Sequence, residues 1–348
     1  MRAITVRGSG RPGMRISEVP DPRPLEDEVL VSGLELGICG TDREICSGLF
    51  GTPPPGRSWF VLGHEGLGRV SRAPSSAHPL REGTLVIGVV RRPDPEPCAA
   101  CSAGEAHGCL NGRYTETGIT SLDGYGSELW TARPEHLVPV AENLRDVGIL
   151  IEPASVVAKA WETIAQLEAG FWSASERVLV TGAGPIGLLA ALFARQRERE
   201  THVFDRDGGL RAALVRDLGA HFHSGRADEV ARRVRPAVVV ETTAAPEVIS
   251  GVSRGLAPHG VLCLLGIAAD DGVAAPVSSR STVLGNQSVF GSVSAGPRHF
   301  QQAQDALLAA PVNWLPRFVT RRLPLEEAEY AVRHHPEDVK VSVVLGDA

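Results

Sequence analysis

Short apolar runs, separated by turns rich in glycine and proline, follow one another from the start of the chain to about residue 155. Residues 28–31 and 85–90 are clear examples. Runs of this length between turn residues are typical of β-strands, and we expect residues 1–6 to form the first of them. The pattern therefore predicts a β-rich, barrel-like module in the first part of the chain.

From about residue 149 the spacing of apolar positions becomes helical, as in Val156, Val157, Ala160, Trp161 and Ile164. Strand-like runs then alternate with helical segments, which is the rhythm of βαβ units that build a parallel sheet. These runs are residues 177–180, 201–204, 237–240 and 261–265, and an amphipathic stretch at 300–308 and a closing strand at 341–345 follow them.

The length of the chain, 348 residues, exceeds that of a usual single core and favours two domains. We therefore predict an α/β protein with a barrel-like first domain over residues 1–158. A doubly wound, parallel-sheet domain follows over residues 159–291. Residues 292–348 are expected to return to the first domain through the closing strand.

Composition and charge exclude several classes of function. The 35 basic and 41 acidic residues are dispersed and leave a net charge of −6, so there is no basic patch for nucleic acid or for a membrane surface. No apolar run approaches the roughly 18 residues of a membrane span. The first residues lack the apolar segment of a signal peptide, so we expect a cytoplasmic protein with a small-molecule substrate.

A glycine-rich turn stands between the strand at 177–180 and a helix predicted over 188–195. Its residues are Gly182, Ala183, Gly184, Pro185, Ile186 and Gly187. In this motif the first glycine allows the tight turn, the second lets a pyrophosphate approach the backbone, and the third lets the helix pack on the strand. The sequence therefore predicts a dinucleotide site, with the pyrophosphate at the helix N-terminus.

Asp205 closes the next strand, about 20 residues after the glycine turn. A carboxylate at this place accepts hydrogen bonds from the adenosine ribose and repels a 2′-phosphate, which favours NAD over NADP. Arg206 follows it, and stacking on adenine or tolerance of a phosphate are both open to it. Lys340 either reaches the pyrophosphate or is solvated.

Candidate ligands for a catalytic metal come from three separate parts of the chain. A catalytic zinc takes about three protein ligands and keeps one position open, and Cys39, His64 and Glu152 would supply such a set. Glu65 follows His64 and either joins the ligands or exchanges with substrate. Asp42 is placed to orient the imidazole.

A zinc ion in such a site holds an alcohol oxygen and stabilises the alkoxide as hydride leaves the carbon. Thr41 lies two residues after Cys39. Its hydroxyl either carries the released proton or serves only as a turn residue.

Several of these motifs together resemble the zinc-dependent medium-chain dehydrogenases, over nearly the whole chain. They are residues 37–42, 63–68 and 152–153 and the glycine turn. Longer strings are similar to the glucose dehydrogenase branch of that family. They lie at residues 91–93, 112–119, 123–125 and 297–302.

The resemblance implies a GroES-like catalytic domain, a Rossmann domain, and assembly as a homodimer or homotetramer. It gives the catalytic zinc to Cys39, His64, Glu65 and Glu152, and places Thr41 beside the reacting oxygen and Glu116 at the substrate hydroxyls. It places six residues at the nicotinamide end of the cofactor, the last of them also near the substrate: Leu265, Gly266, Ile267, Ser292, Val293 and Ser294.

The family also has a structural zinc lobe with four cysteines, but Pro95 occupies the first of the four positions here. Cys98, Cys101 and Cys109 keep the family spacing, and a Cys-x2-Cys pair with a third cysteine favours a metal over free thiols. We expect Asp94 to be the fourth ligand, with His107 as the second choice.

Three positions depart from the branch in a way that bears on the substrate. Where we expect polar, sugar-binding side chains, this chain has Val90, Leu284 and Ser294. An apolar replacement leaves a hydroxyl unpaired, at about 1 to 3 kcal/mol per group. We therefore predict a deoxysugar, a cyclitol or a specialised-metabolite alcohol as the substrate, in preference to glucose.

Two other functions fit the same fold. A reductase of activated double bonds typically works without zinc, and the complete ligand set argues against it. A non-catalytic, nucleotide-binding protein would bind the cofactor without turning over any alcohol.

Overall fold

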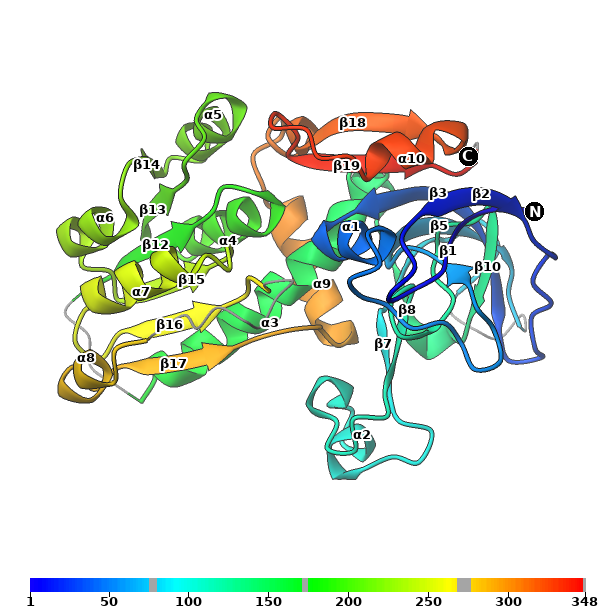
Figure 1. The fold of residues 1–348 in the computed structure, drawn as a ribbon, viewed down its shortest axis with the longest axis horizontal. Helices are drawn as coiled ribbons and strands as arrows, with labels where there is room; N and C mark the ends of the chain where they lie inside the picture. Colours follow the sequence, from blue (N-terminus) through cyan, green and yellow to red (C-terminus); the bar gives the residue numbers. More distant parts are fainter. Residues whose placement is uncertain (75–79, 171–174, 268–276, 347–348) are drawn as a thin grey trace. The chain divides into compact units, whose positions relative to one another are not determined.

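The computed structural model describes residues 1–74, 80–170, 175–267 and 277–346. The chain forms two compact units (Figure 1). The first, the catalytic unit, comprises residues 1–155, 294–308 and 315–348, and the second, the dinucleotide unit, comprises residues 156–293 and 309–314. No helix in the described ranges combines the length and the apolar character that a membrane span needs.

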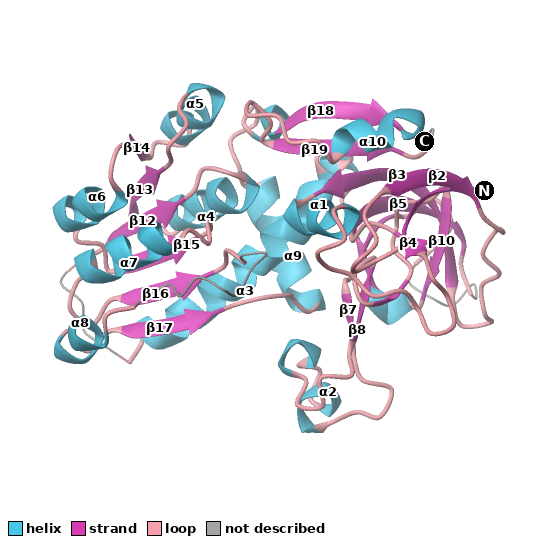
Figure 2. Cartoon of the chain, viewed as in Figure 1, coloured by secondary structure: helices cyan, strands magenta, loops and turns pink. Residues whose placement is uncertain are grey.

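Strands dominate the catalytic unit, as the alternation of short apolar runs predicts (Figure 2). Its strands are β1 (Arg2–Val6), β2 (Met14–Glu18), β3 (Val29–Ile38), β4 (Phe60–Val61), β5 (Glu65–Arg72), β6 (Leu85–Gly88), β7 (Arg91–Arg92), β8 (Thr115–Thr117), β9 (Ser121–Leu122), β10 (Leu129–Ala132), β11 (Leu137–Pro139), β18 (Val319–Pro324) and β19 (Lys340–Val344). Its α-helices are α1 (Gly40–Cys46), α2 (Ala99–Ser102), α9 (Pro297–Leu308) and α10 (Ala328–Ala331).

Short 3-10 helices connect several of these elements. They are η1 (Ala106–Gly108), η2 (Pro134–His136), η3 (Glu142–Leu144), η4 (Gly148–Leu150), η5 (Leu315–Phe318) and η6 (Leu325–Glu327).

A seven-stranded sheet of order β11-β6-β5-β3-β19-β18, with β10 also paired to β3, forms the main layer of the catalytic unit. The closing strand β19 runs antiparallel to β3, with Val341 opposite Ile38. The last strand therefore returns to the first domain, as its sequence predicts. Apolar side chains of β1, β3 and β19, such as Ile4, Val31, Leu36 and Val343, belong to one buried core.

The dinucleotide unit holds a six-stranded sheet in which every pairing is parallel, with the order β14-β13-β12-β15-β16-β17. This is the strand order of a Rossmann fold. The strands are β12 (Arg177–Thr181), β13 (Glu200–Phe204), β14 (His221–His223), β15 (Val238–Glu241), β16 (Val261–Leu264) and β17 (Ser288–Gly291).

Helices connect these strands, as the alternating pattern predicts. They are α3 (Ile151–Glu168), which begins in the catalytic unit, α4 (Pro185–Gln196), α5 (Gly209–Asp217), α6 (Ala227–Val234), α7 (Pro246–Gly255) and α8 (Ser279–Leu284). Side chains of α6 and α7 pack with Leu179, Phe204 and Val239 of the sheet. Strand β14, with the sequence His221-Phe222-His223, has no apolar run, and the sequence analysis missed it.

Candidate active site and dinucleotide site

Cys39, His64 and Glu65 meet in the interior of the catalytic unit. Cys39 follows β3 and precedes α1, and the other two residues stand at the start of β5, which pairs with β3. The Cys39 Sγ lies 3.2 Å from the His64 Nε2. One ligand atom from each of the three residues lies within 4.8 Å of the other two. A thiol, an imidazole and a carboxylate in this arrangement fit the ligand chemistry of zinc.

Asp42 supports this group from the first turn of α1. Its Oδ2 accepts a hydrogen bond of 2.9 Å from the Cys39 amide, and its Oδ1 lies 3.4 Å from the His64 Nδ1. Asp42 is completely buried. Burial by itself lowers the pKa of the His64 imidazole. Cys39 and Asp42 oppose this effect and raise the pKa of His64 well above its usual value. Asp42 therefore turns the Nε2 of the ring towards Cys39, as the sequence suggests.

Glu65 has a partner that the sequence did not reveal. The Lys340 Nζ contacts the Glu65 Oε2, and both side chains are 1% exposed. Strand β19 carries Lys340 and lies beside β3. We expected Lys340 to reach the pyrophosphate or to be solvated, and both expectations are wrong: it is the counter-ion of a buried carboxylate. An unpaired charge at this depth would be strongly unfavourable.

Glu152 lies in the first turn of α3 and is 8% exposed. Its carboxylate does not join the three residues whose ligand atoms lie within 4.8 Å of one another. Desolvation raises its pKa to about 7, against the lowering effect of His64 and with a further rise from Glu65. Glu152 therefore interacts electrostatically with His64 and Glu65, and it stays a candidate ligand.

Thr41 lies in the first turn of α1, between Gly40 and Asp42, and is half-buried. Its backbone is held by the helix that Cys39 begins. Thr41 is therefore held two residues after the candidate ligand Cys39. Its role in proton transfer stays a prediction.

Glu116, the predicted contact for substrate hydroxyls, forms an ion pair across two strands. It stands opposite Arg91, whose Nε and Nη2 donate to its Oε1 at 3.0 and 2.8 Å. The Arg91 guanidinium also lies over the Tyr114 ring, 3.8 Å from its centroid. Only the Oε2 of Glu116 is left for further bonds, with Thr120 at 3.5 Å. The pairing with Arg91 depends on the register of β7 and β8, and nothing in the sequence indicated it.

The lobe around α2 brings the sulfurs of Cys98, Cys101 and Cys109 within 4.8 Å of one another. The amides of Cys101 and Leu110 donate to the Cys98 sulfur and lower the pKa of that thiol to about 6. Three sulfurs this close together, one of which already favours the thiolate form, fit a zinc ion, which binds cysteine as thiolate.

The structure does not bring the predicted fourth ligand, Asp94, to these sulfurs. The Asp94 carboxylate accepts hydrogen bonds from Asn111 Nδ2 at 2.7 Å, from the Glu96 amide at 2.9 Å and from Arg113 Nε at 3.1 Å. His107, the second choice, directs its Nε2 to Glu105 at 2.9 Å. Both side chains are thus bonded to other residues of the lobe, Asp94 to Asn111, Glu96 and Arg113 and His107 to Glu105.

The glycine turn in the dinucleotide unit has the shape that its sequence predicts. Gly182 follows β12 with a φ of +93°, and Pro185 is the first residue of α4. A side chain at Gly187 would place its Cβ 1.8 Å from the Gly182 carbonyl oxygen, so only glycine fits there. The turn thus presents the N-terminus of α4, with Gly184 at the cap and Ile186 in the first turn. This is the geometry that binds a pyrophosphate.

Asp205 follows β13 directly and is 9% exposed. Its Oδ1 accepts from the Asp207 amide at 3.0 Å, and its Oδ2 accepts from the Ala183 amide at 2.5 Å. Arg211 lies 3.8 Å from the same carboxylate, and Arg206 is exposed. The carboxylate therefore stands beside the glycine turn, at the end of the strand where a ribose is bound in this fold.

The residues predicted at the nicotinamide end divide between the two units. Leu265 and Gly266 donate their amides to the Glu241 carbonyl oxygen, Ile267 is 67% exposed, and the Val293 carbonyl accepts from Lys159. The hydroxyls of Ser292 and Ser294 are buried, and neither has a hydrogen-bond partner among the described residues. Ser294 belongs to the catalytic unit and has a φ of +62°.

Of the positions that depart from the branch, Val90 is 7% exposed in the catalytic unit. Leu284 is the last residue of α8 in the dinucleotide unit and is 69% exposed. Val90 is therefore buried within its unit, whereas Leu284 is exposed and does not line a buried pocket within its own unit.

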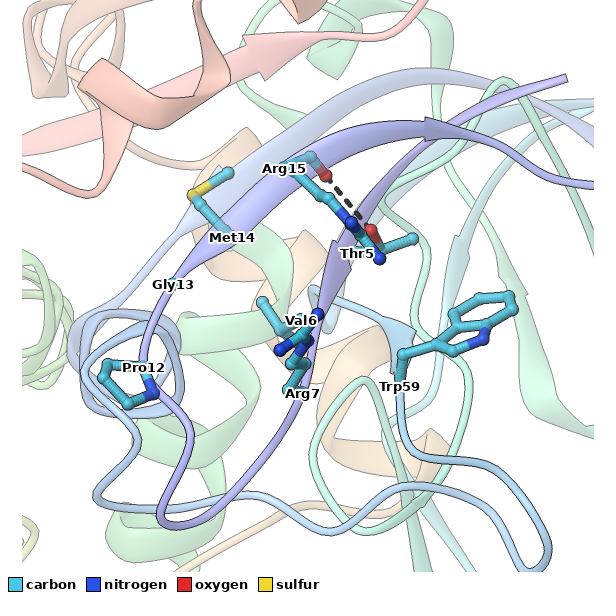
Figure 3. A pocket seen from close by; sticks show the side chains of 8 residues that line it. All are labelled: Thr5, Val6, Arg7, Pro12, Gly13, Met14, Arg15 and Trp59. Carbon is cyan, nitrogen blue, oxygen red and sulfur yellow. Dashed lines mark hydrogen bonds between the residues drawn. The ribbon is translucent and has the colours of Figure 1, made fainter.

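Two cavities of the catalytic unit contain none of the predicted site residues. One, of about 170 Å³, lies between β1, β2 and Trp59 and is lined by Arg7 and Arg15 (Figure 3). The other, of about 670 Å³, is lined by residues of β7, β8, β10 and η2, including Arg92, Trp130 and His136.

Comparison with known proteins decides the family. The family model for the glucose dehydrogenase C-terminus matches residues 145–345, and the model for the alcohol dehydrogenase GroES-like domain matches residues 25–142. The chain belongs to the glucose dehydrogenase family. This membership confirms the predicted resemblance to the medium-chain dehydrogenases, the predicted fold class and the predicted dehydrogenase activity.

Relatives within the family align over their full lengths. Glucose 1-dehydrogenase of Thermoproteus tenax is 38% identical, over 98% of this chain and 98% of the relative. Glucose 1-dehydrogenase of Methanocella arvoryzae is 34% identical, over 99% of this chain and 100% of the relative. The solved structure of Haloferax mediterranei glucose dehydrogenase in complex with NADP, zinc and gluconolactone has a TM-score of 0.91 at 29% identity, and covers 100% of both chains.

Proposed function

We propose that this chain is a zinc-dependent sugar dehydrogenase that oxidises a hemiacetal or secondary alcohol of a cyclic substrate and transfers the hydride to NAD. The carrying observation is the buried group Cys39, His64 and Glu65, with ligand atoms within 4.8 Å of one another. The zinc, NADP and lactone bound to the Haloferax mediterranei enzyme support this class of reaction. A lactone is the product expected when the hemiacetal carbon of a cyclic sugar loses hydride.

Zinc would be held by Cys39 and His64, with Glu65 or Glu152 as the acidic ligand. When bound, it lowers the pKa of an alcohol oxygen and stabilises the negative charge that develops there. Asp42 keeps the imidazole oriented, since its carboxylate bonds the Cys39 amide and faces the His64 Nδ1. The Lys340 ammonium balances the charge of Glu65.

The substrate is held and deprotonated by side chains of the catalytic unit. We place the Thr41 hydroxyl beside the reacting oxygen, where it passes on the released proton. The Oε2 of Glu116 accepts a substrate hydroxyl, because Arg91 occupies only its Oε1. Ser294, with its buried hydroxyl, is a further substrate contact.

We infer a less hydroxylated substrate than glucose, such as a deoxysugar, a cyclitol or another specialised-metabolite polyol. The apolar side chain of Val90 supports this, because a buried apolar group cannot pair with a hydroxyl. A panel of sugars and cyclitols, compared by kcat/KM, tests the inference. Glucose as the best substrate of the panel would overturn it while leaving the reaction class intact.

NAD is the preferred cofactor in this proposal. The Asp205 carboxylate stands beside the glycine turn, where it repels a 2′-phosphate. The measurement is the ratio of kcat/KM for NAD and NADP, in the native chain and in Asp205→Asn. A native ratio in favour of NADP would reject this preference.

Metal analysis together with turnover tests the proposal as a whole. Bound zinc with oxidation of a sugar or cyclitol supports it. Double-bond reduction by a chain without zinc would support the reductase reading instead. Nucleotide binding without turnover of any alcohol would support a non-catalytic protein.

We also propose that the chain assembles as a homodimer or homotetramer, which light scattering would test. The expected location of the protein is the cytoplasm.

A further inference from the structure

Three histidines and a glutamate share one face at the edge of the parallel sheet. Glu200 and His202 alternate along β13, and His221 and His223 alternate along the edge strand β14. His202 pairs with His221 in the register, so all four side chains lie on the same side of the sheet. We call Glu200, His202, His223 and Arg233 the histidine relay, because hydrogen bonds join them in a line.

The three bonds of the relay have ordinary hydrogen-bond lengths. Arg233 Nη2 lies 3.0 Å from His223 Nδ1, His223 Nε2 lies 2.9 Å from His202 Nδ1, and His202 Nε2 lies 3.0 Å from Glu200 Oε1. His202 is 8% exposed and His223 is half-buried, so the bond between the two rings is shielded from water, whereas Glu200 and Arg233 at the two ends are exposed.

The direction of every bond follows from the arginine. A guanidinium only donates, so His223 Nδ1 must carry a lone pair and His223 Nε2 must carry the hydrogen. His223 then donates to His202 Nδ1, and His202 donates through its Nε2 to Glu200. Both imidazoles are therefore neutral, each with its hydrogen on Nε2. Neither imidazole of the relay has a lone pair left for a metal ion.

A proton added to either ring has no place in this line. On His202 it would point at the Nε2–H of His223, and on His223 it would point at Arg233. Burial is the largest cause that lowers the pKa of His202, and the Glu200 carboxylate opposes it. His221, whose ring stacks 4.9 Å from that of His202, and Arg177, which bonds the other oxygen of Glu200 at 3.2 Å, lower this pKa further. Burial, followed by the charges of His202 and Arg233, lowers the pKa of His223 to about 4.

The relay is joined to the dinucleotide site through the backbone. His223 stands opposite Phe204, the last residue of β13, and its carbonyl accepts the amide of Asp205 at 3.0 Å. The same Asp205 holds the Ala183 amide of the glycine turn through its carboxylate. A displacement of β14 therefore removes a bond that fixes the residue proposed to bind the adenosine ribose.

We propose that the histidine relay is a proton-sensitive lock on strand β14, and that its protonation loosens β14 and weakens dinucleotide binding at Asp205. The binding half of this inference rests on the proposed function. The lock itself rests on the bonds within the dinucleotide unit.

The sign of the pH effect follows from neutral histidines in the folded state. An unfolded or detached histidine takes up a proton near pH 6.5. The stabilisation from the relay is therefore complete above about pH 6.5 and is lost progressively as the pH falls towards about 4. Loosening is expected on the acidic side only.

The test combines two measurements on the full chain between pH 7.5 and pH 5. Amide hydrogen exchange of residues 221–223, corrected for the intrinsic effect of pH, reports the lock. The Kd of NADH, read by its fluorescence, reports the site. We expect both to rise in the native chain, exchange by about tenfold and Kd by about fivefold, as for the uptake of one proton over this range.

The matched variants separate a lock from a merely structural contact. The double substitution His202→Asn with His223→Gln keeps an acceptor and a donor for the central bond but cannot titrate, so both responses should fall below about twofold. His223→Gln alone serves if the double variant does not fold. His221→Gln removes a neighbour outside the relay and should keep the native response.

The possible results test the lock, its link to Asp205 and the proposed function separately. Corrected exchange that is independent of pH in the native chain would overturn the lock. Exchange that rises while the Kd stays constant would overturn the link to Asp205. A chain that binds no NADH even at pH 7.5 would contradict the proposed function, and the exchange measurement would still decide the lock.

Discussion

The catalytic unit contains two groups of candidate metal ligands that are built in opposite ways. One, the buried group, consists of three different side chains held by strands β3 and β5 and helix α1: the half-buried Cys39 and the buried His64 and Glu65. The other is a group of three thiols from a short stretch of chain in a lobe: Cys98, Cys101 and Cys109. The first depends on the tertiary fold, and the second depends mainly on local turns.

The difference shows in the thiols. Burial raises the pKa of the Cys39 thiol, so without a cation this cysteine stays protonated. In the lobe, amide hydrogen bonds lower the pKa of Cys98 to about 6, so the backbone already favours the thiolate. The comparison shows that Cys39 would need a bound cation to favour its thiolate form, whereas the backbone of the lobe favours the thiolate of Cys98 without one.

Replacing a ligand of the buried group should have the largest effect. We expect His64→Ala to lower kcat/KM by about 10³-fold or more, since several kcal/mol of charge stabilisation are lost. The exposed His334 offers a control, and His334→Ala should change kcat/KM by less than about twofold. Steady-state kinetics with metal analysis checks both, and near-native activity in metal-free His64→Ala would refute the buried site.

A smaller effect is expected from the side chain that orients the imidazole. Asp42→Asn keeps the shape but removes the charge that faces His64 Nδ1 at 3.4 Å. Metal affinity should fall about 10- to 100-fold, as for other groups that support a ligand. Competition with a chelator of known affinity measures the loss. An unchanged affinity would mean that Asp42 serves only to accept the Cys39 amide at the start of α1.

The two thiol environments should differ in reactivity once metal is removed. At pH 7 Cys98 is mostly thiolate, because its pKa is about 6. We expect alkylation of Cys98 to be at least about tenfold faster than that of Cys39, whose pKa burial raises. The rate at Cys98 should fall as the pH drops below about 6. Peptide mapping after timed alkylation gives both rates, and faster reaction at Cys39 would reverse the comparison.

The smallest effect on catalysis is expected in the lobe. Cys98→Ser should remove the metal of the lobe and lower thermal stability, while kcat/KM of the folded protein changes by less than about threefold. Metal content, melting temperature and kinetics on the same sample check this. A loss of activity as large as that of His64→Ala would show that the lobe takes part in the reaction.

Local patterns in the sequence were enough to predict much of the fold. The apolar run before Gly182 and the helical spacing after it lead directly to β12 and α4. Strand β14 was missed because two of its three residues are histidines, which carry no apolar signal. Its place at the sheet edge depends on pairing with β13, and pairing is a long-range property.

The site was predicted less evenly. Cys39 and His64 were found because their neighbours form motifs, and Asp42 because it follows three residues after the cysteine. Lys340 was misread because nothing near it in the chain points to Glu65, its partner from 275 positions away in the printed sequence. Asp94 was chosen as a ligand because it is close in sequence, yet Asn111 and Arg113 bind its carboxylate.

By itself, the sequence determined which elements form, where the glycine turn lies and which residue types are available to hold a metal and a dinucleotide. These depend on periodicity, turn chemistry and short spacing, all of which act over a few residues. The tertiary structure alone decided which charged or polar side chains are paired, namely Glu65 with Lys340, Glu116 with Arg91 and His202 with His223. Such pairs depend on strand register and burial, because a charge removed from water must find its partner wherever the fold has placed one.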